Sequence, residues 1–159
     1  MNDSQTAPDQ AAERSAELFA QGFCCSESVL QALAESQGVR SDLIPRIATG
    51  MCAGIARTGG ICGAVSGGVL AISMVTGRSS PKASREENHR LVREFLNQCE
   101  AQFGSTNCEK LIGCRLDTPE GQRFFNEHNL RVKCAGLARE AARLAARLLA
   151  ETDQSARRH

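Results

Sequence analysis

Residues 58–77 read TGGICGAVSGGVLAISMVTG and contain no charged side chain, although they lie between Arg57 and Arg78. An uncharged stretch of this length could just span a bilayer. Its first residues are rich in glycine, however, and serine and threonine interrupt the remainder, so the apolar part is too short for a span. We therefore predict a buried central helix over about 62–76, ended by Gly77, around which the other helices pack.

The rest of the chain also shows apolar residues at helical spacing, and no segment shows the sustained alternation of a half-buried strand. The segment 84–103 is the clearest case, because it begins with the capping-box pattern Ser84-x-x-Glu87 and repeats apolar residues along one face. Further helices are predicted at about 8–21, 24–37, 42–51, 107–112, 118–128 and 130–150. The predicted fold class is all-α, a compact single-domain bundle of about six helices plus short helical turns.

The predicted domain covers residues 8–151, with flexible tails at 1–7 and 152–159. Within it, residues 53–60 are expected to form a glycine-containing loop. The first ten residues are polar and acidic and lack the basic and apolar regions of a secretory signal, which predicts a cytoplasmic location.

Charge and aromatic content exclude several classes of function. The chain has 19 Lys and Arg residues against 18 Asp and Glu residues, and neither Trp nor Tyr. This balance argues against electrostatic binding to nucleic acid or to an acidic membrane surface. The missing aromatic residues remove the usual anchors of base stacking and of binding hot spots. We therefore expect no nucleic-acid partner and no membrane partner.

Cysteine is the unusual component, with eight residues at positions 24, 25, 52, 62, 99, 108, 114 and 134. A reducing cytosol makes a disulfide network a weak explanation, so metal ligation, redox chemistry and burial as small apolar residues remain. At a helix start, free N–H groups and the helix dipole lower the pKa of a thiol. The cysteines predicted to lie at or near helix starts are Cys24, Cys25, Cys62, Cys108 and Cys134. If those helix starts converge, they form one electropositive pocket lined with sulfur.

Small residues follow one of these cysteines. On the predicted central helix, Gly63, Ala64 and Gly67 leave a surface with few side-chain atoms beside Cys62. Such a surface admits either a compact inorganic cluster or the backbone of another helix, and the latter could belong to a homodimer partner. The sequence leaves both readings open.

The order of the cysteines and glycines resembles the C_GCAxxG_C_C family of redox-active proteins. The resemblance runs over about residues 18–149, and the stretches that carry it are Gly22-Phe23-Cys24-Cys25-Ser26, Gly59-x-x-Cys62-Gly63-Ala64-x-x-Gly67, Gly104-x-x-x-Cys108 and Cys134. It implies a small cytoplasmic helical protein whose signature cysteines are Cys25, Cys62, Cys108 and Cys134. A similar domain is associated with an iron–sulfur site in split-Soret cytochromes, but this chain lacks their Cys-x-x-Cys-His haem-attachment motif.

Three cysteines, Cys52, Cys99 and Cys114, lie outside that signature, and Cys24 stands where the family often has a polar residue. Of these, Cys24 and Cys52 are the candidate additional ligands. Cys99 lies on an apolar helix face and is expected to be a buried small hydrophobe. The roles of Cys24, Cys52 and Cys114 are left open.

The leading hypothesis is an iron–sulfur cluster held by the four signature cysteines, in an electron carrier or oxidoreductase that serves a redox partner protein. The first alternative is a cofactor-free thiol/disulfide protein, with Cys25–Cys62 or Cys108–Cys134 as the dithiol. A zinc site ranks third, because structural zinc sites usually have closely spaced cysteine pairs. In the last alternative the cysteines are core residues of a helical interaction domain.

Overall fold

The computed structural model describes the chain from residue 3 to residue 156, and side chains from residue 6 to residue 153. Over this range it contains eight α-helices, one 3-10 helix (η1) and no strand, which confirms the all-α prediction. In chain order the elements are α1 (Asp3–Ala20), α2 (Cys25–Ser36), η1 (Arg46–Met51), α3 (Cys52–Ile55), α4 (Gly63–Thr76), α5 (Glu86–Phe103), α6 (Cys108–Ile112), α7 (Pro119–Glu127) and α8 (Arg131–Ala156).

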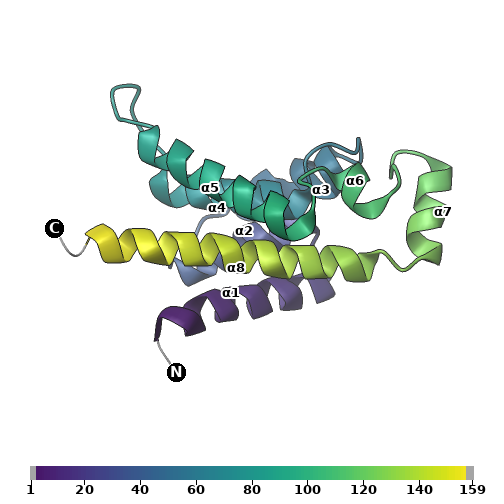
Figure 1. Ribbon diagram of the computed structural model, residues 1–159, viewed down its shortest axis with the longest axis horizontal. Helices are drawn as coiled ribbons and strands as arrows, with labels where there is room; N and C mark the ends of the chain where they lie inside the picture. The colour runs from purple at the N-terminus through teal and green to yellow at the C-terminus, as the bar shows by residue number, and fades with distance from the viewer. Residues whose placement is uncertain (1–2, 157–159) are drawn as a thin grey trace.

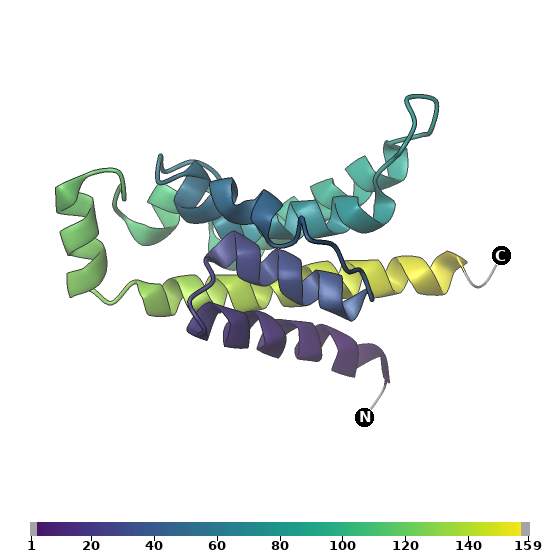
Figure 2. The same cartoon turned by 180° about the vertical axis from the view of Figure 1, so that it is seen from behind.

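The long helices form the body of the molecule, and α8 runs along its whole length between α1 on one side and the α4–α5 pair on the other (Figure 1). Helix α2 lies on the far side in this view and packs against α1, α4 and α8 (Figure 2). The short helices α3, α6 and α7 gather at one end, where α7 stands across the direction of the bundle. Helices α3 and α6, which begin with Cys52 and Cys108, thus lie at that end.

Helix α4 is the buried central helix that the uncharged stretch predicts. Its residues from Gly63 to Gly68 are all buried, and it packs against α2, α5 and α8. Among the described residues, no helix is long and apolar enough to cross a membrane.

Two glycines of α4 allow its close packing. A Cβ atom added to Gly67 would lie 2.7 Å from the carbonyl oxygen of Ser26 on α2, and one added to Gly68 would overlap the ring of Phe95 on α5. Both positions therefore bring neighbouring helices nearer than a side chain would permit. At Gly67 the small-residue surface serves helix packing within the chain.

Several predicted boundaries differ from the structure. The helix predicted at 42–51 is replaced by turns followed by η1, because Pro45 disfavours helical geometry at the preceding residue. The prediction of a capping box at Ser84 is wrong as well. The N-cap of α5 is Arg85 instead of Ser84, and the Glu87 side chain pairs with Arg90 instead of reaching back to the backbone.

Both predicted tails overlap with helices at the ends of the chain. Helix α1 already includes residues 3–7, and α8 continues through 152–156. The remaining parts of the predicted tails, 1–2 and 157–159, lie outside the described residues.

Candidate functional site

A cavity of about 280 Å³ lies at the end of the bundle where the short helices gather, and six of the eight cysteines line it. They are Cys24, Cys25, Cys52, Cys62, Cys108 and Cys134. These residues come from α3, from the starts of α2, α4 and α6, and from the first turn of α8. All four signature cysteines therefore face one space, although they are spread over more than 100 residues of sequence.

A short backbone pairing places two of these cysteines next to each other. The N–H of Cys62 donates to the carbonyl of Thr106 at 2.8 Å, and the N–H of Cys108 donates to the carbonyl of Gly60 at 2.7 Å. Asn107, between them, donates from its side-chain amide to Gly59 and caps α6. The pairing holds the starts of α4 and α6 side by side, so both thiols point into the same cavity.

The third signature cysteine depends on a glycine. A Cβ atom added to Gly63 would overlap the sulfur of Cys25 and would lie 3.1 Å from the carbonyl oxygen of Met51. Gly63 also lines the cavity, whereas Ala64 and Gly67, the two other small residues predicted beside the cofactor, do not. Ala64 is fully buried in the core, and Gly67 contacts the backbone of α2.

The cavity wall between Cys52 and Cys62 contains a left-handed turn, which includes the residues of the short helix α3 after Cys52. Five consecutive residues have positive φ, with values of 55° at Ala53, 69° at Gly54, 59° at Ile55, 49° at Ala56 and 72° at Arg57. Only Gly54 adopts this region without steric cost, and each L-residue there costs roughly 1–2 kcal/mol. The predicted loop at 53–60 is thus a strained segment that presents Ala53 and Arg57 to the cavity.

Burial determines the acidity of these thiols, in contrast to the expectation from helix starts. Burial raises the pKa of Cys62 to about 11, and it raises those of Cys108 and Cys134 to about 12. Neighbouring sulfurs add to the increase, since a second thiolate nearby disfavours the charged form. The N–H groups of Ala64 and Val65 lower the pKa of Cys62, but by less than burial raises it. The prediction of low-pKa thiols is therefore wrong for these three residues.

The charged residues that line the cavity are both cationic. Arg57 belongs to the left-handed turn, while Arg131 opens α8, lies over the Phe19 ring at 4.4 Å and donates to the Phe19 carbonyl at 3.0 Å. The remaining wall is largely apolar and includes Leu111 and Phe125. The two guanidinium groups favour an occupant that carries negative charge, and the apolar wall keeps water away from it.

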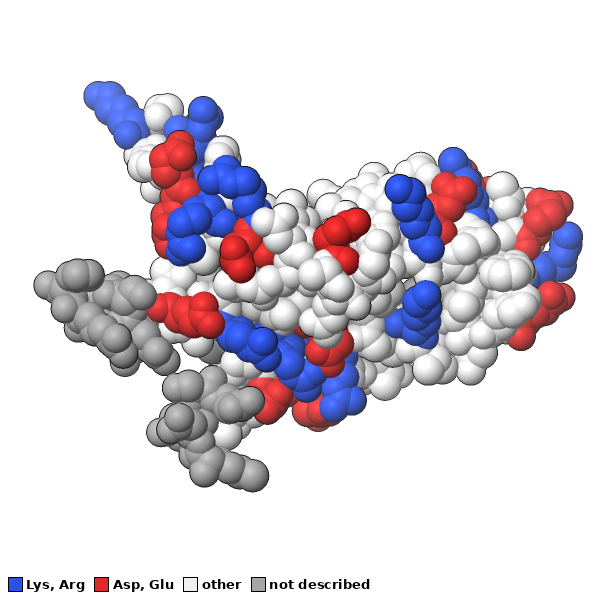
Figure 3. Space-filling model, viewed as in Figure 1, with Lys and Arg blue, Asp and Glu red and all other residues white. Residues whose placement is uncertain are grey.

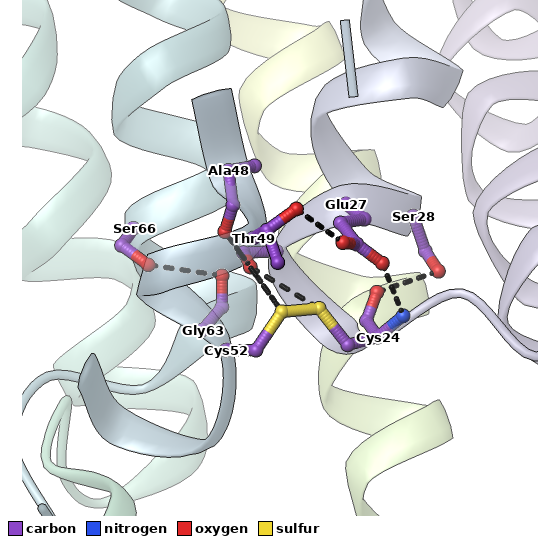
Figure 4. The surroundings of a disulfide bond; sticks show 9 residues. Cys24, Glu27, Ser28, Ala48, Thr49, Cys52, Gly63 and Ser66 are labelled. Atoms are coloured by element: carbon purple, nitrogen blue, oxygen red, sulfur yellow. Dashed lines mark hydrogen bonds between the residues drawn. A yellow bond between two sulfur atoms is a disulfide. The ribbon is translucent and has the colours of Figure 1, made fainter. Parts of the chain in front are cut away.

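Two of the six cysteines are bonded to each other. Cys24 and Cys52 form a disulfide with their Cα atoms 6.0 Å apart, across 28 positions of sequence (Figure 4). The alternative hypothesis expects a dithiol at Cys25–Cys62 or at Cys108–Cys134, and all four of those cysteines are free. No local motif signals the Cys24–Cys52 pair, because only the docking of η1 against α2 brings its members together.

The ligand atoms of Cys24, Glu27 and Cys52 lie within 4.8 Å of one another. Glu27 accepts a hydrogen bond from the Cys24 N–H at 3.0 Å and another from the Thr49 hydroxyl at 2.7 Å. Of the described residues, these are the ones that could hold a single metal ion in this way. The disulfide and such a metal site exclude each other, since both use the same two sulfurs.

The two cysteines outside the cavity occupy different surroundings. Cys99 is fully buried in the core against α4 and α8, as its place on an apolar helix face predicts. Cys114 is half-buried, just beyond the C-cap of α6.

The chain belongs to the C_GCAxxG_C_C family. The family model, described as "Putative redox-active protein (C_GCAxxG_C_C)", matches residues 23–148 and so confirms the resemblance found in the sequence. No match was found among curated proteins or among solved structures. The molecule is therefore a cysteine-rich, all-α member of a redox-active family.

Proposed function

We propose that Cys25, Cys62, Cys108 and Cys134 ligate an iron–sulfur cluster, and that the protein is a cytoplasmic electron carrier or oxidoreductase serving a redox partner protein. The observation that carries this proposal is the meeting of four free cysteines, from four separate helices, around one cavity. Four thiolates are the usual complement of a [2Fe–2S] or [4Fe–4S] centre.

The spacing of the sulfurs favours a cluster over a single zinc ion. Two thiolates on one tetrahedral zinc lie about 3.8 Å apart, given a Zn–S bond of about 2.3 Å. Among the described residues, the three-ligand group within 4.8 Å is Cys24, Glu27 and Cys52, which contains none of the four signature sulfurs. Cys25, Cys62, Cys108 and Cys134 would therefore suit a larger centre with several irons better than one tetrahedral ion.

The size and lining of the cavity also suit a compact anionic group. At about 280 Å³ it lies just below the roughly 300–1,000 Å³ range of small-molecule sites, so a large organic cofactor is disfavoured. Arg57 and Arg131 supply positive charge, and the apolar wall limits access of water. Because the thiols of Cys62, Cys108 and Cys134 are protonated at neutral pH, loading must release their protons.

When bound, an iron–sulfur cluster supplies one-electron transfer. The protein's own residues contribute the thiolate ligands, the space that Gly63 leaves beside Cys25, and the two guanidinium groups. Burial and nearby charge are the features by which a protein adjusts the potential of such a centre.

The test is an absorption spectrum of anaerobically purified protein, with iron, zinc and acid-labile sulfide measured on the same sample. The lack of Trp and Tyr leaves the near-ultraviolet almost empty, so partial occupancy is visible. We expect visible bands with iron and sulfide, lost in Cys62→Ser and retained in the control Cys114→Ser. Colourless wild-type protein without iron or sulfide would contradict the proposal.

A further inference from the structure

We infer that Cys24 and Cys52 form a second redox site, a reversible dithiol–disulfide couple that exchanges electrons with the centre held by the four signature cysteines. The inference rests on the proposed function, because it uses that centre as its electron source. Neither residue belongs to the family signature, yet both line the same cavity and are bonded to each other. The couple would act on small-molecule disulfides, since its sulfurs are half-buried in the wall of a small cavity.

Both cysteines of the disulfide lie close to the proposed centre. Cys24 directly precedes the ligand Cys25, so their Cα atoms are about 3.8 Å apart. At the other end, Met51 directly precedes Cys52, and its carbonyl oxygen approaches the same side of Gly63 as the sulfur of Cys25. Electrons that leave the centre therefore need to cross only neighbouring residues to reach the S–S bond.

The surroundings of the disulfide offer hydrogen-bond acceptors to two thiols. The hydroxyl oxygen of Ser26 lies 3.5 Å from the Cys24 sulfur and 3.1 Å from the Cys52 sulfur. That hydroxyl donates to the Ala48 carbonyl at 2.8 Å, which leaves its lone pairs free to accept from an S–H group. The Ala48 carbonyl also lies 3.8 Å from the Cys52 sulfur. Both thiols of the reduced pair would thus find hydrogen-bond acceptors.

A carboxylate stands beside the pair as well. Glu27 has an oxygen within 4.8 Å of both sulfurs, and it is held by the Cys24 N–H and the Thr49 hydroxyl, as Figure 4 shows. The site would therefore combine a nearby electron source with hydrogen-bond acceptors for both thiols.

The reaction balances as follows. Reduction breaks the S–S bond and consumes two electrons and two protons to give the thiols of Cys24 and Cys52. A cluster held by Cys25, Cys62, Cys108 and Cys134 would supply the electrons one at a time, a low-potential one-electron carrier would replace them, and solvent would supply the two protons. The dithiol then reduces a small disulfide by exchange, which re-forms the Cys24–Cys52 bond and releases two thiols.

Tryptic peptides make the couple directly measurable in the full-length protein. Cys52 is the sole cysteine of peptide 47–57, and peptide 15–40 contains Cys24 and Cys25. Anaerobic iron-loaded protein would be reduced with photoreduced methyl viologen, alkylated and digested with trypsin. The masses of the resulting peptides would then be measured by mass spectrometry. Iron and sulfide would be measured on the same sample beforehand, so a failure of the proposed function is recognised separately.

We expect the 15–40/47–57 cross-link to disappear on reduction and to return when 2-hydroxyethyl disulfide is added, with two thiols released per chain. The cross-link should be absent from Cys24→Ser and Cys52→Ser and unchanged in Cys114→Ser. Viologen should open it much more slowly in Cys62→Ser, which retains the pair but loses the centre.

Three results would overturn the inference. In the first, the bond stays closed although the visible bands show that the centre is reduced, which would make the disulfide structural. In the second, the bond opens equally fast in Cys62→Ser, so the centre is not the source of the electrons. In the third, the wild-type protein retains a metal ion that is lost only in Cys24→Ser and Cys52→Ser, so the pair is a ligand site.

Discussion

At the scale of single residues, Gly63 occupies the glycine position that contacts a signature cysteine most directly, because an added Cβ atom would overlap the Cys25 sulfur. It begins α4, lines the cavity and faces the sulfur of Cys25 so closely that no Cβ atom fits. Gly67 and Gly68, about one turn further along α4, serve packing between helices. Gly63 instead leaves the space that the side chain of the proposed ligand Cys25 occupies. A methyl group at this position would therefore act on the site more than on the core.

We predict that Gly63→Ala displaces Cys25 and weakens retention of iron by about 10-fold or more, as for other residues that orient a metal ligand. The measurement is the iron and sulfide content after dialysis against a chelator. Gly136→Ala is the matched control, because a Cβ atom there meets nothing within 4 Å. Equal iron loss in both variants would show that the contact with Cys25 is unimportant.

At the scale of elements, the left-handed turn at residues 53–57 joins Cys52 to the segment that leads into α4. Five hydrogen bonds hold it. The Ala56 N–H donates to Gly50, the Gly60 N–H donates to Gly54, and Thr58 donates from its N–H to Ile55 and from its hydroxyl to both Gly54 and Ile55. These bonds offset part of the steric cost of four L-residues at positive φ. The strain is located in the cavity wall, where it sets the position of Arg57.

We predict that Ala56→Gly raises the free energy of unfolding by roughly 0.5–1 kcal/mol, because relief of left-handed strain exceeds the added chain entropy. Ala101→Gly, at an exposed position within α5, should lower it by about 1 kcal/mol. Urea unfolding of the two variants and the wild type measures both. Destabilisation by Ala56→Gly of the same size as by Ala101→Gly would contradict the strain argument.

Helix α7 stands apart from the long helices and contributes Phe125 to the cavity wall (Figure 1). We predict that Phe125→Ala opens this wall and speeds the bleaching of the visible bands in air. Phe124→Ala is the control, because Phe124 stacks on His128 at the surface and does not line the cavity. The decay of absorbance after exposure to oxygen is the measurement, and equal rates in the two variants would contradict a shielding role for α7.

At the scale of the whole molecule, charges of both signs lie interspersed on the face shown in Figure 3. Part of this pattern is structural. Arg139 pairs with Glu13, and Arg143 pairs with Asp9 and with Glu140, so α8 is linked to α1 along the bundle. Such exposed pairs contribute little stability each, and the buried apolar core remains the main stabilising feature.

The buried thiols give the whole molecule an expected pH dependence. Burial raises the pKa of Cys99 to about 12, as it does for Cys108 and Cys134, from an ordinary value of 9.0. Between these values the folded state binds more protons than the unfolded state, so stability falls as pH rises. We predict that the free energy of unfolding of reduced, metal-free protein decreases as pH rises above about 9.

Urea unfolding at a series of pH values from neutral to about 11 tests this expectation. Each fully shifted thiol adds a slope of up to about 1.4 kcal/mol per pH unit. Cys99→Ala removes one such group from the core, so its decline should be shallower than that of the wild type. A free energy of unfolding that stays flat through this range would mean that the thiols ionise freely in the folded protein.

The sequence alone determined the helical class, the burial of α4 and the family, because these depend on local spacing and on an ordered motif. Apolar periodicity and the absence of charge act within one helix, and a single chain displays them directly. The strained turn at 53–57 and the 3-10 form of η1 were not readable, since tertiary contacts override local preference there.

Only the tertiary structure decided which sulfurs meet and how acidic they are. The Cys24–Cys52 bond depends on the docking of η1 beside α2. The cavity that the cysteines share depends on the pairing of residues 60–62 with 106–108. The high pKa of Cys62 follows from the same assembly, because desolvation by surrounding helices outweighs the local field of one helix start. Distances and burial between remote segments are properties of the packed chain, and no local pattern encodes them.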